Sequence, residues 1–181
     1  SLLQVVSETG TLTISDTSGW LESGSSIVLS GKNVDVDGVV RNNAASADVD
    51  DAELVILATE GIYLHGAIGI LGSMLIAAGG DILVQGMALS AQQAGAKLVM
   101  NAGGAITLGG IESLTSATAV IAEANALLGL RAGTQITVFA DAQLLSTGDD
   151  SLLDLQAPTI NVRGQLRAGA DSSFAFDPSQ E

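Results

Sequence analysis

The residues best suited to chemistry in this chain are one histidine and one closely spaced pair of aspartates. His65 is the single histidine, and the chain has no cysteine. Asp35 and Asp37 are two residues apart, so on a strand both would point to the same side. The corresponding positions 28 residues later hold Tyr63 and His65. A metal site needs convergent ligands, and polysaccharide cleavage needs carboxylates gathered in a groove.

Because the next repeat offers neither a second histidine nor further acids, we expect Asp35 and Asp37 to solvate a sheet face. We expect His65 to be an ordinary surface residue. No Ser-His-acid constellation is marked by a nucleophile-elbow motif. The sequence therefore predicts no catalytic residues, no cofactor and no enzymatic activity.

The densest run of acidic residues, between positions 48 and 53, raises the question of a calcium site. Hard cations take six to eight oxygen ligands, often from one loop. Neither the EF-hand spacing nor the glycine-rich nonapeptide of calcium-binding β-rolls is found here. We expect a solvated loop, with a weak calcium site as the competing interpretation. The residues are Asp48, Asp50, Asp51 and Glu53.

The element that must position these residues is a short repeat of alternating apolar residues. Seven copies start 22, 28, 20, 24, 30 and 24 residues apart, and a small residue follows most of them two positions later. Repeats of this length are single supersecondary units that stack on their neighbours. The copies begin at Leu12, Val34, Ile62, Ile82, Ile106, Ile136 and Ile160.

Each repeat is expected to hold three short strands separated by turns, because the alternation has period two and Gly pairs punctuate it. This predicts an all-β, single-stranded parallel β-helix, a β-solenoid, of about seven coils that we expect to wind right-handed. At a spacing of about 4.8 Å per coil the rod would be roughly 34 Å long. Residues 1–181 would form one domain, with insertions near 41–53 and 112–126. The series from Val120 to Ala132 fits a long or doubled strand, and a short helix is the competing interpretation.

The composition excludes two kinds of partner, nucleic acids and the membrane interior. The chain has 20 acidic and 6 basic residues, a net charge of −14, so it would repel phosphate backbones and nucleic-acid binding is not expected. No apolar run is long enough for a membrane helix, so membrane insertion is not expected either. Aromatic residues make up only 3% of the chain, which suits a thin core of small aliphatic side chains.

The outward positions of the first strand in each coil are unusually apolar. Stacking would join them into a lateral-contact strip, which either a segment of the chain or another rod would cover. Its members are Val28, Val55, Leu57, Leu75, Ala77, Val99 and Leu127. Three aromatic residues near the ends of the chain, Trp20, Phe174 and Phe176, are candidates for contacts at the ends of the rod.

The repeat resembles a known class of bacterial protein. The segments Ala102–Leu108 (Ala-Gly-Gly-Ala-Ile-Thr-Leu) and Ala157–Gly164 (Ala-Pro-Thr-Ile-Asn-Val-Arg-Gly) resemble the degenerate repeats of large exported β-helical adhesins of the filamentous haemagglutinin type. This resemblance implies a secreted or surface-displayed, non-enzymatic shaft. The secretion-domain signature of that family is not found in this chain, and no ligand or catalytic residue carries over.

We therefore predict an extracellular or cell-surface shaft of an adhesin or fibre. Its partners would be copies of itself, head-to-tail or side by side, or neighbouring repeats of a longer chain, with a glycan or host surface as a further candidate. The alternative is a carbohydrate-binding or polysaccharide-cleaving β-helix, in which Asp35 and Asp37 would act. An ice- or mineral-facing surface would need a regular threonine or aspartate ladder, and Thr13, Thr107 and Thr137 are too scattered for one.

Overall fold

The structure, a computed structural model, describes residues 2–15, 20–23, 26–42, 53–86, 88–110, 118–122, 126–169 and 173–177. Every regular element in these ranges is a β-strand. None of the described residues forms a helix that could cross a membrane. The expected all-β architecture is confirmed.

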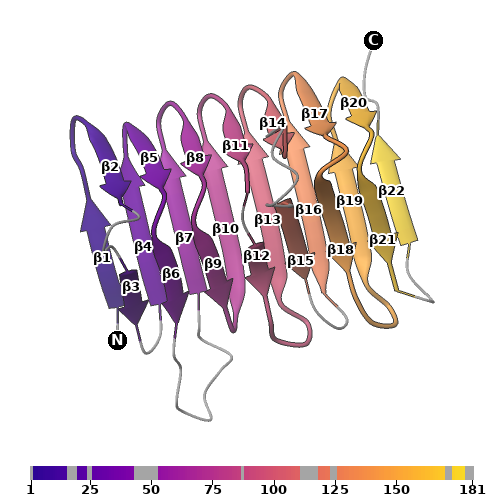
Figure 1. The fold of residues 1–181 in the computed structure, drawn as a ribbon, viewed down its shortest axis with the longest axis horizontal. Helices are drawn as coiled ribbons and strands as arrows, with labels where there is room; N and C mark the ends of the chain where they lie inside the picture. Colours follow the sequence, from indigo (N-terminus) through magenta and orange to yellow (C-terminus); the bar gives the residue numbers. More distant parts are fainter. Residues whose placement is uncertain are drawn as a thin grey trace.

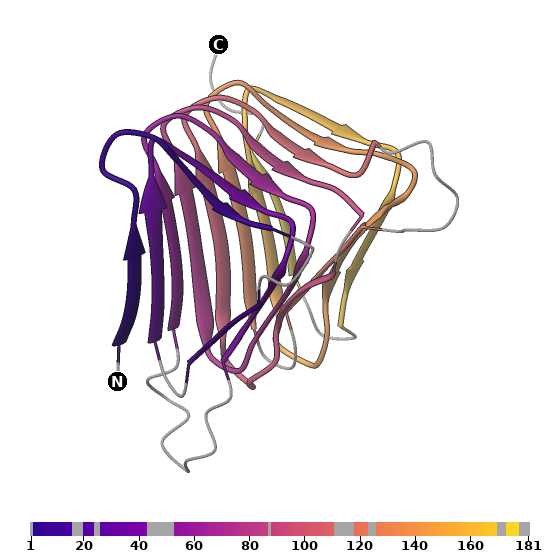
Figure 2. The same cartoon turned by 60° about the vertical axis from the view of Figure 1, so that its left-hand side comes forward.

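The strands form three parallel sheets that together enclose a tube (Figures 1 and 2). Successive strands belong to the first, second and third sheet in turn, and each pairs with the strand three positions later. The first and last described strands, β1 (Leu2–Val6) and β22 (Ser173–Asp177), lie at opposite ends of the tube (Figure 1). This is the stacked β-solenoid that the repeat predicts.

The first sheet has eight described strands and the other two have seven each. The first consists of β1 (Leu2–Val6), β4 (Ser26–Gly31), β7 (Glu53–Ala58), β10 (Ser73–Ala78), β13 (Lys97–Ala102), β16 (Leu127–Ala132), β19 (Leu152–Gln156) and β22 (Ser173–Asp177). The second consists of β2 (Thr11–Ile14), β5 (Asn33–Val36), β8 (Ile62–Leu64), β11 (Ile82–Val84), β14 (Ile106–Leu108), β17 (Gln135–Val138) and β20 (Thr159–Val162). The third consists of β3 (Trp20–Ser23), β6 (Val39–Asn42), β9 (Ala67–Ile70), β12 (Ala88–Ala91), β15 (Thr118–Ala122), β18 (Ala142–Ser146) and β21 (Gln165–Ala168).

The seven copies of the repeat lie in register in the second sheet. Val34 pairs with Ile62, Ile62 with Ile82, and Ile82 with Ile106, so one apolar residue lies over the next along the tube. These four side chains are fully buried. The column continues through Ile136, also buried, and is only partly buried at its two ends, Leu12 and Ile160. Apolar burial in such columns is the main stabilising term of the fold.

The turn between the first and second sheets is closed by stacked glycine backbones. A Cβ atom on Gly103 would clash with the carbonyl oxygen of Gly79, and one on Gly133 would clash with that of Gly103. The amide of Gly103 donates to the carbonyl of Ala78 one coil earlier, at 3.0 Å. Only a residue without a side chain allows this approach, which explains the repeated Gly pairs.

The series from Val120 to Ala132 consists of two strands. Thr118–Ala122 is β15 in the third sheet, and Leu127–Ala132 is β16 in the first. The doubled strand was therefore the correct interpretation, and the described part of the series contains no helix. β15 also lies inside the interval 112–126 that we expected to be an insertion, so part of that interval belongs to the stack. In the interval 41–53, Arg41 and Asn42 end β6 and Glu53 begins β7.

Candidate functional site

Stacking brings Asp35, Asp37 and His65 to one place on the outside of the tube. Asp35 lies on β5 and pairs with Tyr63 on β8. Asp37 and His65 follow these two strands in equivalent turns. The amide of Asp37 donates to Ile14 one coil earlier, and the amide of His65 donates in the same way to Val36, both at 2.8 Å. His65 therefore lies one coil above Asp37.

The turn that carries His65 is held close to the coil below by glycine. A Cβ atom on Gly66 would clash with the carbonyl oxygen of Gly38, so this position requires glycine. The amide of Gly66 also donates to the carbonyl of Val36, at 2.8 Å. Backbone contacts thus fix the position of the His65 backbone in the turn, and the His65 side chain plays no part in them.

The three side chains converge. One ligand atom from each of Asp35, Asp37 and His65 lies within 4.8 Å of the other two, and all three residues are half-buried. Oδ1 of Asp35 is buried and accepts no hydrogen bond from any described residue. We refer to these three residues as the Asp-Asp-His cluster.

The electrostatics of the cluster are seen in the pKa of Asp35. Burial raises the pKa of Asp35, the neighbouring Asp37 carboxylate raises it further, and His65 acts in the opposite direction. The paired positions on the flanking strands, Thr13 and Leu83, carry no charge. Two close carboxylates and one imidazole are able to bind a cation.

The lateral-contact strip lies on the outer face of the first sheet. Val28, Val55, Leu75 and Val99 occupy one continuous row, each paired with the next. Leu57 and Ala77 form a second pair beside them, and Leu57 is 40% exposed. Leu127 pairs with Lys97 and Leu152, in the outward row on the other side of the row that contains Val99.

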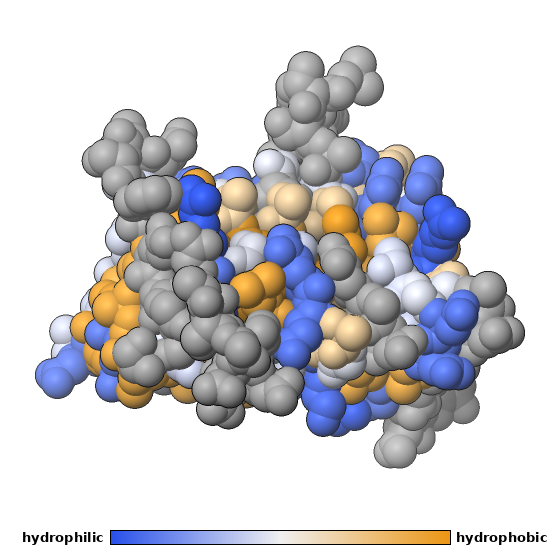
Figure 3. Space-filling view, turned by 90° about the horizontal axis from the view of Figure 1, so that it is seen from below, coloured by the Kyte–Doolittle hydropathy of each residue, from blue (hydrophilic) through white to orange (hydrophobic). Residues whose placement is uncertain are grey.

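A shallow groove adjoins one edge of this strip. It has a volume of about 410 Å³ and is lined by the ends of β1, β4, β7 and β10 and by adjoining turns, including Val6, Ser30, Leu57 and Ala77. Seen from below, the molecule shows apolar surface gathered at the end of the rod where β1 lies (Figure 3). Leu2 and Val6 of β1 are 61% and 51% exposed.

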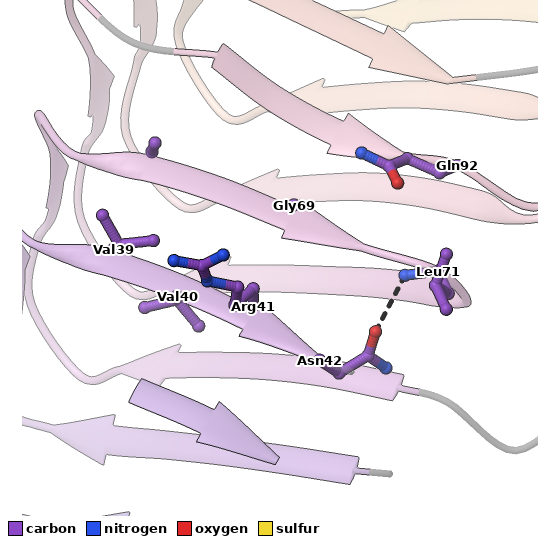
Figure 4. A pocket seen from close by; sticks show the side chains of 8 residues that line it. Val39, Val40, Arg41, Asn42, Gly69, Leu71 and Gln92 are labelled. Atoms are coloured by element: carbon purple, nitrogen blue, oxygen red, sulfur yellow. Dashed lines mark hydrogen bonds between the residues drawn. The ribbon is translucent and has the colours of Figure 1, made fainter. Parts of the chain in front are cut away.

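A second groove crosses the outer face of the third sheet (Figure 4). Its volume is about 430 Å³, and its polar lining consists of Arg41, Asn42 and Gln92. Oδ1 of Asn42 accepts a hydrogen bond from the amide of Leu71 at 2.9 Å. Gly69 leaves the middle of the groove open because it has no side chain, and a Cβ atom there would meet only Gln92 and Ser90, at 3.5 and 3.6 Å.

A third groove, of about 370 Å³, lies where the turns meet the second sheet, between Asn33, Glu60, Tyr63 and Asp81. Its rim carries an exposed ion pair between Lys32 and Glu60, with Nζ and Oε1 3.0 Å apart. Hydrogen bonds from Lys32 and Asn33 lower the pKa of Glu60. All of these contacts lie on the solvent side of the sheet.

The remaining expected sites are described only in part. Trp20 lies on β3, and Phe174 and Phe176 lie on β22; these are edge strands of the third and first sheets at opposite ends of the tube. Their side chains are outside the described residues, as are Asp48, Asp50, Asp51 and the side chain of Glu53.

No protein-family model, curated protein or solved structure matches the chain.

The sequence places Asp35, Asp37 and His65 on neighbouring coils, but it does not predict that their side chains converge. The repeats align Asp37 with His65, but two acids and one histidine were expected to be too few ligands for a site. The dipeptides Asp37-Gly38 and His65-Gly66 occupy the same place in successive repeats, so their side chains should be stacked like the strands.

Proposed function

We propose that this chain is a non-catalytic shaft segment of an extracellular or surface-displayed adhesin or fibre. In such a shaft the tube supplies length and rigidity, and further coils add at its ends. The resemblance of the repeats to filamentous haemagglutinin-type adhesins favours this function over others open to the fold.

The observation that carries the proposal is how the burial of side chains changes along one inner column of the second sheet. Val36, Leu64, Val84, Leu108 and Val138 are fully buried, each covered by the coils on both sides. Val162 is the next member of the same column and is 38% exposed. At the other end Ile14 is 7% exposed.

An exposed core residue beside an unpaired ladder edge favours the addition of another strand. A further coil of the same cross-section would bury Val162 and extend all three ladders. That coil can come from a second copy or from neighbouring repeats of a longer chain, and both arrangements produce a rod.

The lateral strip supports a second mode of contact, between rods lying side by side. Its row of four residues is apolar over successive coils, and contiguous apolar surface of this kind usually marks a contact. Leu75 lies near the centre of the row, between Val55 and Val99.

Sedimentation velocity and electron microscopy over a range of protein concentrations would test the proposal. We expect oligomers or filaments that grow with concentration. Val162→Lys should shorten them if they grow end to end, and Leu75→Lys should separate rods that associate laterally. Leu145→Lys, an outward-facing leucine on the third sheet, is the matched control. Dispersed monomers at the highest concentration would contradict self-assembly.

A carbohydrate-binding β-helix is the second candidate, favoured by the groove of the third sheet. Its volume suits a small ligand, and Arg41, Asn42 and Gln92 offer polar contacts. Gly69→Val should fill this groove without disturbing the ladder. Glycan-array binding that Gly69→Val abolishes would support this candidate, and cleavage lost in Asp35→Asn and Asp37→Asn would support an enzyme.

A further inference from the structure

We propose that the Asp-Asp-His cluster is a binding site for a divalent transition-metal ion of the zinc type. Asp35, Asp37 and His65 would be its three protein ligands, and water would complete the coordination. The site goes beyond the shaft function and does not depend on it.

The chemistry of the donor set selects the kind of ion. Carboxylates alone favour calcium or magnesium, whereas imidazole favours zinc, copper, nickel or iron(II). One imidazole with two carboxylates is a mixed nitrogen and oxygen set, and three protein ligands plus water are a common arrangement for zinc. The two carboxylates would also neutralise the charge of a divalent cation.

The geometry is close to what such an ion requires. Ligand atoms around a tetrahedral zinc ion lie roughly 3.3 Å apart, given zinc–ligand bonds of about 2.0–2.2 Å. The three donor atoms already lie within 4.8 Å of one another. The equivalent turn hydrogen bonds fix the backbone positions of Asp37 and His65. Small side-chain rotations would then bring the three donor atoms to the distances that the ion requires.

A second observation points to a missing cationic partner. Oδ1 of Asp35 is buried and accepts no hydrogen bond from a described residue. A buried carboxylate oxygen without a partner is unfavourable, and native proteins nearly always satisfy such atoms. Here the neighbouring acceptor, Asp37, adds repulsion rather than a hydrogen bond. A metal ion held between the carboxylates and His65 would relieve both effects.

An ion bound at this site would connect two neighbouring coils and stabilise the fold. Asp35 and Asp37 belong to one coil and His65 to the next, so a bound ion would join two coils from outside the tube. Because binding to the folded state alone stabilises that state, the ion would raise resistance to unfolding as its concentration rises above the dissociation constant.

The test is a zinc titration of the purified chain followed by calorimetry and by the NMR signals of the imidazole nitrogens. His65 is the single histidine and no cysteine competes, so every imidazole signal reports on this site. We expect one saturable zinc ion per chain and a shift of the imidazole nitrogen signals at the same concentration. This readout needs no variant, so it does not depend on a variant folding.

Variants then assign the ligands. His65→Asn and Asp37→Asn should each weaken zinc binding by at least about tenfold, since loss of even an indirect metal contact typically has that effect. Asp149→Asn is the matched control because Asp149 is an exposed carboxylate outside the cluster. Circular dichroism would verify that each variant remains folded.

Three results would overturn the proposal. The first is a zinc titration in which the imidazole signals do not move. The second is unchanged zinc affinity in both His65→Asn and Asp37→Asn. The third is calcium binding as tight as zinc binding and insensitive to His65→Asn, which would identify a carboxylate patch without a role for the imidazole.

Discussion

The inner and outer columns of the second sheet lie one residue apart on the same strands, yet they follow opposite rules. The inner column runs Val34, Ile62, Ile82 and Ile106, similar aliphatic side chains that are all fully buried. The outer column on the same strands runs Asp35, Tyr63, Leu83 and Thr107, with no shared chemistry. The inner column specifies the stack, and the outer column is free to vary.

This difference explains where function can be sought in such a fold. A substitution in the inner column lowers the stability of the coils that pack against it, whereas a substitution on the outer face changes mainly what the surface binds. The Asp-Asp-His cluster and the lateral strip are both outside, and both depend on the register that the inner column sets. Experiments on the two columns should therefore separate stability from binding.

The largest loss of stability is expected when a side chain of the inner column is truncated. Ile82 is fully buried between Ile62 and Ile106, so Ile82→Ala should lower the free energy of unfolding by about 2–5 kcal/mol, the usual range for such truncations. Urea denaturation followed by circular dichroism would measure it.

Two controls sharpen this comparison. Leu83→Ala, on the outer side of the same strand, should lower stability much less. Ile160→Ala, in the same inner column but only partly buried, should fall between the two. Equal losses for Ile82→Ala and Leu83→Ala would mean that the two faces do not differ as we describe.

A smaller effect is expected in the glycine column. Gly103→Ala places a Cβ atom against the carbonyl oxygen of Gly79, so the coils must separate locally, and overpacking of this kind costs about 1–3 kcal/mol. Gly129→Ala is the matched control, because its Cβ atom would meet only Val99, at 3.9 Å. Thermal unfolding of the two variants should show a lower midpoint for Gly103→Ala alone, and a lower midpoint for both would contradict a specific role for the turn.

Much of the fold could be predicted from the sequence because its determinants are local and repeated. The alternation around Ile62, Ile82 and Ile106 contains both the strand period and the stacking register. Repetition fixed the register, since any slip by one residue would expose every inner side chain. The same alternation also places the lateral strip on an outer face.

The sites were harder to predict because they depend on distances between coils. The rows of the lateral strip do not follow from the alternation alone, because outward residues of one strand belong to several rows. Leu127, for example, lies in the row of Lys97, next to the row of Val99. The convergence of Asp37 and His65 depends on a turn that the strand pattern does not describe. The alignment of Asp37 with His65 is visible in the sequence, but the distance between their side chains is not.

The smallest expected effect concerns Asp35, where the outer column itself influences stability. The pKa of Asp35 is higher in the folded protein than its ordinary value of 3.8 because of burial and the nearby Asp37. The folded state therefore binds this proton more tightly than the unfolded state, so the ionised carboxylate destabilises the fold at neutral pH. That penalty disappears as the pH falls through the raised pKa.

Asp35→Asn should consequently stabilise the metal-free protein at pH 7, by about 0.5 kcal/mol given solvent screening at this partly exposed position. The gain should shrink on acidification and vanish below the ordinary carboxyl pKa, where both states of the wild-type protein are protonated. With zinc present the sign should reverse, because the variant loses a ligand that stabilises the folded state of the wild-type protein. Urea denaturation at pH 7 and pH 3, with and without zinc, measures all of these differences. A substitution that destabilises the metal-free protein at pH 7 would show instead that the Asp35 carboxylate is favourably paired in the folded state.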